Sequence, residues 1–165
     1  MKKRIISNLV FILILATIVI MACNNSSNPV NTGSATYTVS GSINFVDTNI
    51  VEDTTVGVYT VDAFAVWPPQ SSPNGYAFLN ITKSGAAYTA NYSIPGLSNG
   101  TYVLTCAFLR KPYTANSVIG LGLYSCDTSH APACVGSPTS KASVQGYNVT
   151  GINFLSWLDT NKRVY

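Results

Sequence analysis

The feature that most constrains the fold is a two-residue alternation that begins near Thr36. Between Thr36 and Phe45, every second position is apolar or glycine, and the positions between them carry hydroxyl or amide groups. In a β-strand, successive side chains point to opposite faces, so this alternation predicts a half-buried strand with a hydroxyl-rich outer face.

Further β-rich runs follow at Thr55–Trp67, Gly75–Thr82, Ala87–Ile94, Thr101–Arg110, Val118–Tyr124 and Ala142–Trp157. Turn residues such as Pro95-Gly96 and Ser98-Asn99-Gly100 separate these runs. No window outside the N-terminal segment keeps a helical apolar spacing, so almost no helix is expected. The pattern predicts an all-β fold, a single seven-stranded antiparallel β-sandwich over residues 36–158, followed by a C-terminal tail at 159–165.

Two of the runs allow finer predictions. Thr101–Arg110 is apolar on both sides, which predicts a strand in the middle of a sheet. In Thr55–Trp67, Asp62 falls among the residues of one face, so the opposite face should point to the core unless a bulge reverses the order. The residues expected on that core face are Tyr59, Val61, Ala63, Ala65 and Trp67.

The N-terminus has the three-part layout of a secretory signal. A basic patch at Lys2–Arg4 precedes the apolar run Leu9–Ala22, which is shorter than the roughly 20 residues that a membrane-spanning helix needs. Residues 1–22 are therefore expected to be a cleaved signal peptide. Residues 24–35 carry no charge and few large apolar groups, so 23–35 should be a flexible spacer.

The residues Ile20-Met21-Ala22-Cys23 resemble the lipobox of bacterial lipoproteins. The resemblance implies that Cys23 becomes the lipidated first residue of the mature protein, which would anchor it to a membrane of the bacterial cell envelope. The outer membrane or the cell surface is favoured over the inner membrane. An ordinary signal peptide with an incidental Cys23, or an uncleaved short anchor, are the alternatives.

Charge argues against nucleic acid as a partner. The formal net charge is +3, with nine basic and six acidic residues. Lys2, Lys3 and Arg4 supply that excess, and the rest of the chain is balanced. Binding to a phosphate backbone requires a concentrated basic face, which the remaining sequence does not offer.

Three segments together resemble the carboxypeptidase regulatory-like, or transthyretin-like, β-sandwich: Val39–Ile43, Tyr92–Leu104 and Val149–Phe154. The resemblance implies a non-catalytic accessory module, in a family sometimes grouped with carbohydrate-binding sandwiches. In the central segment we expect Gly96 and Gly100 to adopt positive φ in a hairpin turn, and Leu97 to plug one end of the sandwich.

Of the four cysteines, Cys126 and Cys134 flank a short polar loop and are the natural disulfide pair in an oxidising compartment. The alternative is a metal site in which the two thiols and the intervening His130 are ligands. Cys106 lies within the apolar run Thr101–Arg110 and should be a buried, unreactive thiol.

Two further groups of residues are candidates for a calcium site and for a ligand-binding surface. Asp47, Asn49, Glu52 and Asp53 could supply oxygen ligands to calcium, although a solvated loop is the simpler interpretation. Trp67, Tyr76 and Trp157 are candidate ligand-facing aromatic residues, although most aromatic side chains in a small sandwich are part of the core.

No catalytic constellation and no cofactor motif is recognisable, so an enzyme is not expected. The expected function is that of a membrane-anchored, non-catalytic accessory module, either structural or one that binds a surface ligand such as a carbohydrate or an envelope protein. The alternative is a small envelope hydrolase or a calcium-binding module that uses the Asp47–Asp53 loop, or a hydrolase that uses His130.

Overall fold

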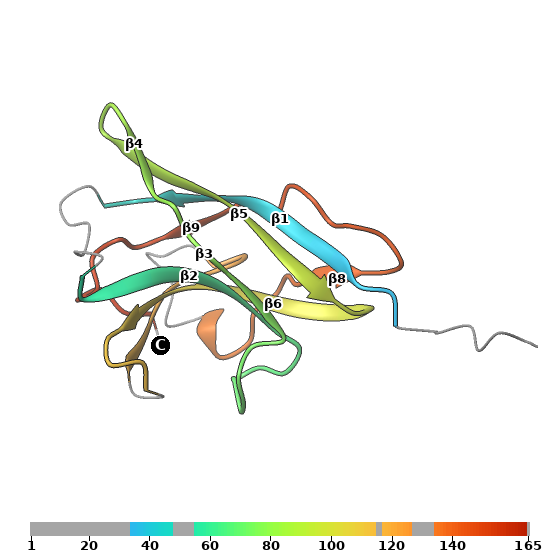
Figure 1. Cartoon of the computed structure of the whole chain (residues 1–165). Helices are drawn as coiled ribbons and strands as arrows, with labels where there is room; N and C mark the ends of the chain where they lie inside the picture. Colours follow the sequence, from blue (N-terminus) through green and yellow to red (C-terminus); the bar gives the residue numbers. More distant parts are fainter. Residues whose placement is uncertain (1–33, 48–54, 115–116, 127–133, 165) are drawn as a thin grey trace, which may run out of the picture. The chain divides into compact units, whose positions relative to one another are not determined.

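The computed structural model describes residues 34–47, 55–114, 117–126 and 134–164. This part of the chain contains nine strands in two sheets (Figure 1). The strands are β1 (Tyr37–Phe45), β2 (Gly57–Phe64), β3 (Gly75–Phe78), β4 (Thr82–Ser84), β5 (Ala87–Leu97), β6 (Gly100–Arg110), β7 (Val118–Leu123), β8 (Ala142–Val144) and β9 (Phe154–Ser156). The all-β prediction is confirmed, and the described helical residues are limited to single turns.

The count of seven strands was wrong because two of the predicted runs are interrupted. Gly75–Thr82 contains β3 and only the first residue of β4, and Ala142–Trp157 contains the short strands β8 and β9 with a long connection between them. Sheet A has the order β4-β5-β1-β9, and sheet B has the order β3-β2-β6-β7, with β8 also paired to β6.

Sheet A is mixed, which corrects the prediction of a purely antiparallel sandwich. β9 lies parallel to β1, with Ile43 opposite Phe154 and Phe45 opposite Ser156. The parallel pairing arises because the chain leaves β8 in sheet B, crosses to sheet A and then follows β1 in the same direction, making a further parallel bridge between Val39 and Val149.

One apolar core fills the space between the two sheets. The prediction for the inner face of β2 is confirmed within the strand, because Tyr59, Val61 and Ala63 are buried. Beyond the end of β2, Ala65 is exposed and Trp67 is partly buried, so the alternation does not continue there. The central position of β6 is also confirmed: it pairs with β2, β7 and β8, and is buried from Tyr102 to Phe108.

The turn between β5 and β6 is a corner between the two sheets and not the expected hairpin, because β5 belongs to sheet A and β6 to sheet B. Leu97 is 1% exposed and packs in the core at this corner. Gly96 and Gly100 both have positive φ, as expected, at 78° and 159°. The Tyr102 hydroxyl donates a hydrogen bond of 2.9 Å to the Ser98 carbonyl, an arrangement similar to the tyrosine corner of Greek-key sandwiches.

The three segments that carry the family resemblance meet at β1: Val39–Ile43 lies in β1, the first part of Tyr92–Leu104 lies in the neighbouring strand β5, and Val149–Phe154 runs along the other side, whereas the second part of Tyr92–Leu104 continues into β6 of sheet B. Residues 148–156 run along β1, and two asparagine side chains take the place of backbone carbonyls: Asn148 accepts from the Thr38 amide and Asn153 from the Ser42 amide, each at 2.9 Å. The Tyr92 hydroxyl donates to the Ile152 carbonyl at 2.6 Å. The edge of β1 is thereby closed by an irregular segment rather than by a full strand.

A second apolar cluster covers one end of the outer face of sheet B. It contains Val103, Leu123 and Cys126, with Trp67 and Cys134 packed against it. Cys126 and Cys134 form the predicted disulfide, with a Cα–Cα distance of 5.9 Å. Since the disulfide and Trp67 lie together, this cluster fixes the position of the chain that leaves β2.

Candidate functional site

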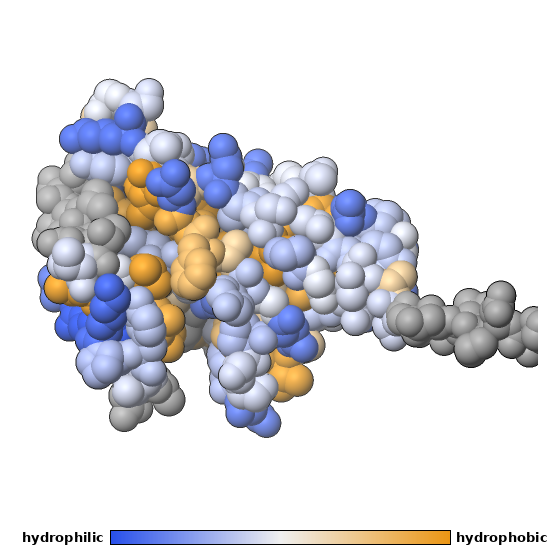
Figure 2. All heavy atoms as spheres, viewed as in Figure 1, coloured by the Kyte–Doolittle hydropathy of each residue, from blue (hydrophilic) through white to orange (hydrophobic). Residues whose placement is uncertain are grey.

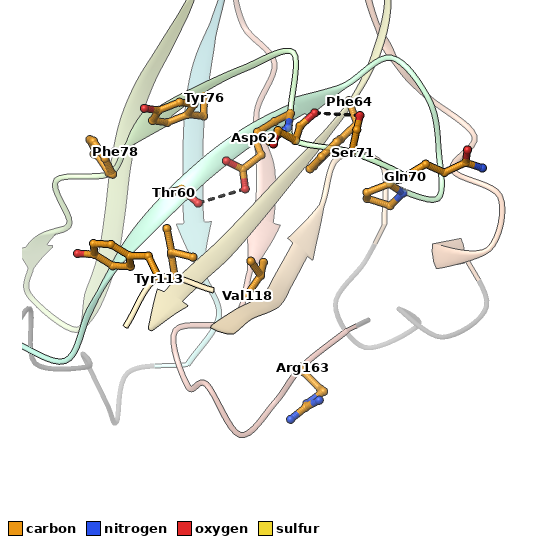
Figure 3. A pocket seen from close by; sticks show the side chains of 14 residues that line it. Thr60, Asp62, Phe64, Gln70, Ser71, Tyr76, Phe78, Tyr113, Val118 and Arg163 are labelled. Atoms are coloured by element: carbon orange, nitrogen blue, oxygen red, sulfur yellow. Dashed lines mark hydrogen bonds between the residues drawn. The ribbon is translucent and has the colours of Figure 1, made fainter. Parts of the chain in front are cut away.

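A groove of about 1080 Å³ lies on the outer face of sheet B (Figure 3). Strands β2, β3, β6 and β7 contribute to it, and so do the loop after β2 and Arg163 near the C-terminus. Figure 2 shows apolar side chains exposed among hydrophilic ones on one face of the molecule. The lining residues are Thr60, Asp62, Phe64, Pro69, Gln70, Ser71, Ser72, Pro73, Tyr76, Phe78, Leu109, Tyr113, Val118 and Arg163.

Exposed aromatic rings line one side of this groove. Tyr76 and Phe78 are two residues apart on β3, so their side chains share the outer face of this edge strand. Their ring centroids are 5.6 Å apart with an interplanar angle of 77°. Tyr76 is 54% exposed, Phe78 64% and Tyr113 55%, so all three rings are available for contact with a ligand.

Asp62 lies next to this aromatic group. In the register between β2 and β3, Asp62 is directly opposite Tyr76, and Thr60 is opposite Phe78. Directly opposite residues on one face of an antiparallel pair have Cβ atoms only about 4.5–5.5 Å apart. The register therefore places the Asp62 carboxylate beside the Tyr76 ring, on the floor of the groove (Figure 3).

The Asp62 carboxylate is poorly compensated. Among the described residues, its hydrogen-bond partner is the Thr60 hydroxyl at 3.1 Å, and no cationic group is within ion-pair distance. Burial raises the pKa of Asp62 from 3.8 to about 6, and the Thr60 hydrogen bond opposes this shift. Burial therefore disfavours the charged form of the Asp62 carboxylate, and its oxygens can accept further hydrogen bonds from a ligand.

Thr105 adds a second unsatisfied group to the same region. It is directly opposite Asp62 in the register between β2 and β6, and it is fully buried. Its hydroxyl oxygen has no hydrogen-bond partner among the residues that the structure describes. Since most buried polar groups in folded proteins are hydrogen-bonded, Asp62 and Thr105 form an unusual pair on this outer face.

Asn74 positions the loop that forms the other wall of the groove. Its side-chain oxygen accepts a hydrogen bond from the Ala65 backbone amide at 2.8 Å, and the backbone amide of Asn74 donates to the Ala63 carbonyl at 2.8 Å. These bonds close the connection between β2 and β3, which carries Gln70, Ser71 and Ser72 into the groove lining. The groove therefore combines aromatic faces with amide and hydroxyl groups.

The three aromatic candidates from the sequence lie in different places. Tyr76 lines the groove. Trp67 packs against the disulfide cluster and donates from its Nε1 to the Val135 carbonyl at 2.6 Å. Trp157 packs against the main core, and the Lys162 ammonium lies 4.3 Å from the centroid of its ring. Trp67 and Trp157 therefore do not join Tyr76 in the groove.

Sequence reasoning missed Phe78, Tyr113 and Asp62 as site residues. Phe78 could have been found from its two-residue spacing to Tyr76 on a predicted strand. The alternation marks Asp62 as a polar residue on the outer face of its strand, and nothing in the sequence selects it from the other carboxylates as a site residue. No local signal in the sequence indicates that Tyr113, in the loop after β6, reaches the same groove.

Asp47 has a structural role in the fold. Its two carboxylate oxygens accept hydrogen bonds from the Leu158 amide at 2.6 Å and from the Asp159 amide at 2.9 Å. Lys162 lies 4.0 Å away from the same carboxylate. The other candidate calcium ligands, Asn49, Glu52 and Asp53, lie outside the described residues, as do His130 and the lipidation candidate Cys23.

The disulfide excludes a metal site that uses Cys126 and Cys134 as thiolates. Cys106 is free and fully buried in the main core, and burial raises the pKa of its thiol to about 12. The thiol therefore stays protonated at neutral pH, which makes it a poor nucleophile.

Within the ranges that the structure describes, no group of three or more His, Cys, Asp or Glu side chains is arranged to hold a metal ion. The same residues contain no helix with the length and apolarity needed to cross a membrane. Comparisons with family models, with curated proteins and with solved structures found no match to this chain.

Proposed function

We propose that this chain is a lipid-anchored protein of the bacterial cell envelope, on the outer membrane or the cell surface, whose β-sandwich binds a carbohydrate without catalysis. The groove on the outer face of sheet B is the proposed binding site. The lipobox-like sequence that ends at Cys23 supports the anchor, and the rest of the proposal depends on the groove.

One observation carries the binding proposal: three exposed aromatic rings, from Tyr76, Phe78 and Tyr113, line a single groove together with hydroxyl, amide and carboxylate groups. A sugar presents an apolar face of C–H groups and a rim of hydroxyls. Flat rings cover the first, and fixed polar side chains such as Thr60, Gln70 and Asp62 can bond the second.

Binding is favoured over hydrolysis by the composition of the groove. Most glycosidases need two carboxyl groups, about 5 to 9.5 Å apart, on either side of the scissile bond. Among the described residues that line the groove, Asp62 is the one with a carboxyl group. A bound sugar would therefore be held without the acid and base that cleavage requires.

We also propose a relation to the carboxypeptidase regulatory-like, or transthyretin-like, sandwiches. The support is that Val39–Ile43, Tyr92–Leu104 and Val149–Phe154, which carry the resemblance in sequence, contact one another in the fold. The parallel segment beside β1 would then be part of what this sequence pattern encodes.

The binding proposal is tested by measuring the affinity of the full chain in detergent for a panel of immobilised glycans, with Tyr76→Ala and Phe78→Ala combined. Removing two stacking rings should weaken binding of the best glycan at least tenfold. Tyr147→Ala is the matched control, because Tyr147 is 59% exposed and does not line the groove. If no glycan binds, or if the double variant binds like the control, the carbohydrate proposal is wrong and an envelope protein becomes the better candidate.

A further inference from the structure

The charge in the groove is unevenly placed. Asp62 is on the floor, beside Tyr76, whereas the Arg163 guanidinium lies at the margin, away from it (Figure 3). No ion pair joins Asp62 to a described cation, so its negative charge is available to a ligand. The Thr60 hydroxyl on the same strand donates a hydrogen bond to it, and the residues opposite it on the adjacent strands are Tyr76 on β3 and Thr105 on β6.

We propose that this groove selects a ligand that carries a primary ammonium group, and that Asp62 is the residue that binds the ammonium. The inference rests on the proposed function and specifies its ligand class as a sugar with a free amino group. The ring of Tyr76 contributes to the same subsite, because it is directly opposite Asp62 across the strand pair.

Two interactions would act on the ammonium together. Its N–H groups can donate to the Asp62 carboxylate, which uses little of its acceptor capacity in the described structure. Its positive charge is also attracted to the face of an aromatic ring within about 6 Å. A neutral substituent at the same place can donate a hydrogen bond to the carboxylate, but it carries no positive charge to attract either the carboxylate or the ring.

An uncharged ligand would bury the Asp62 carboxylate further without supplying a positive charge to compensate it. A sugar that covers the groove removes water from Asp62, and a buried charge without a partner is strongly destabilising. An acetylated amino group would bury the carboxylate without compensating its charge, and an acidic sugar would add repulsion. The groove is therefore expected to discriminate between forms of one sugar that differ only in whether the amine is free.

The test compares a glucosamine hexamer with an N-acetylglucosamine hexamer, by calorimetry on the full chain in detergent at about pH 7. The free-amine hexamer should bind at least tenfold more tightly. Asp62→Asn keeps the shape of the side chain and removes its charge, so it should reduce this preference to less than threefold. Asp159→Asn removes one negative charge outside the groove and should leave the preference unchanged.

The outcomes separate the two proposals. Equal binding of both hexamers that is lost in the Tyr76 and Phe78 double variant would overturn the ammonium subsite and leave carbohydrate binding intact. A preference that survives in Asp62→Asn would overturn the role of Asp62. If neither hexamer binds and the wider glycan panel is also negative, the carbohydrate function itself is overturned. Thermal unfolding of each variant confirms that it is folded.

Discussion

At the scale of single residues, Asp62 links the stability of the sandwich to pH. Its pKa is raised from 3.8 to about 6 in the fold, so the folded chain holds this proton at pH values where the unfolded chain has lost it. The contribution of Asp62 to stability is therefore greatest below about pH 4, and it declines as the pH rises from about 4 to about 6.

Asp62→Asn should remove that dependence, because the amide does not titrate. A shift of this size corresponds to at most about 3 kcal/mol, so the variant should be more stable than the parent by up to that amount at pH 7 and no more stable at pH 3.5. Denaturant midpoints measured between pH 3.5 and pH 8 would check this. Identical profiles for the two proteins would show that burial does not disfavour the charged form.

Stability and binding therefore place opposite demands on residue 62. A neutral side chain there is better for the fold, whereas a carboxylate is better for a positively charged ligand. Residues that lower stability without an evident structural benefit are candidates for function. This conflict distinguishes Asp62 from Asp47, whose two oxygens are both used to hold the backbone after β9.

At the scale of secondary-structure elements, the irregular segment 148–156 depends on a glycine in its neighbour. A Cβ atom on Gly41 would overlap the backbone carbonyl of Ile152, which cannot move aside as a flexible side chain can. Gly41→Ala should push this segment away from β1 and strain the bonds that Ser40 makes with Val149 and Ile152.

We expect Gly41→Ala to lower the free energy of unfolding by about 1–3 kcal/mol, measured by urea denaturation. Gly136→Ala is the control, since a Cβ atom at Gly136 meets nothing within 4 Å and should change stability little. If both variants unfold at the same urea concentration, the close approach of the two segments is not needed for the fold.

The strands differ in how well the sequence predicts them. β1 and β6 follow from alternation or from a continuous apolar run, because these patterns are local. β9 does not, since it has only three residues and its partner β1 lies more than a hundred positions earlier. The hydrogen bonds of Asn148 and Asn153 that extend this pairing come from side chains, so no periodicity reports them.

The groove, like β9, could not be predicted from local sequence patterns. Tyr76 was a candidate in the sequence and Asp62 was recognised as an outer-face residue, but their proximity depends on the register between β2 and β3. A shift of one residue would turn either side chain to the opposite face. The Asn74 hydrogen bonds in the loop between β2 and β3 go together with this register. They depend on the three-dimensional structure, so the composition of the sequence does not predict them.

At the scale of the whole molecule, Cys23 should decide where the domain is held. Cys23→Ser removes the thiol that would carry the lipid, so the variant should leave the detergent phase of a Triton X-114 partition, whereas the parent should stay in it. Stable anchoring needs more than one acyl chain, and thioether-linked diacylglycerol supplies two. A variant that still enters the detergent phase with residues 1–22 attached would indicate an uncleaved anchor instead.

The position of β9 has a consequence for when this chain can fold. β9 pairs with β1 in sheet A, and the next residue, Trp157, donates its amide to the Leu121 carbonyl of β7 in sheet B. Leu158 is then fully buried, with its carbonyl bonded to the Tyr59 hydroxyl at 2.7 Å. The core thus requires β1 and β9 at the same time, and contacts of such long range form slowly. Because β1 emerges from the ribosome before β9, we expect the core to close only after β9 has emerged as well.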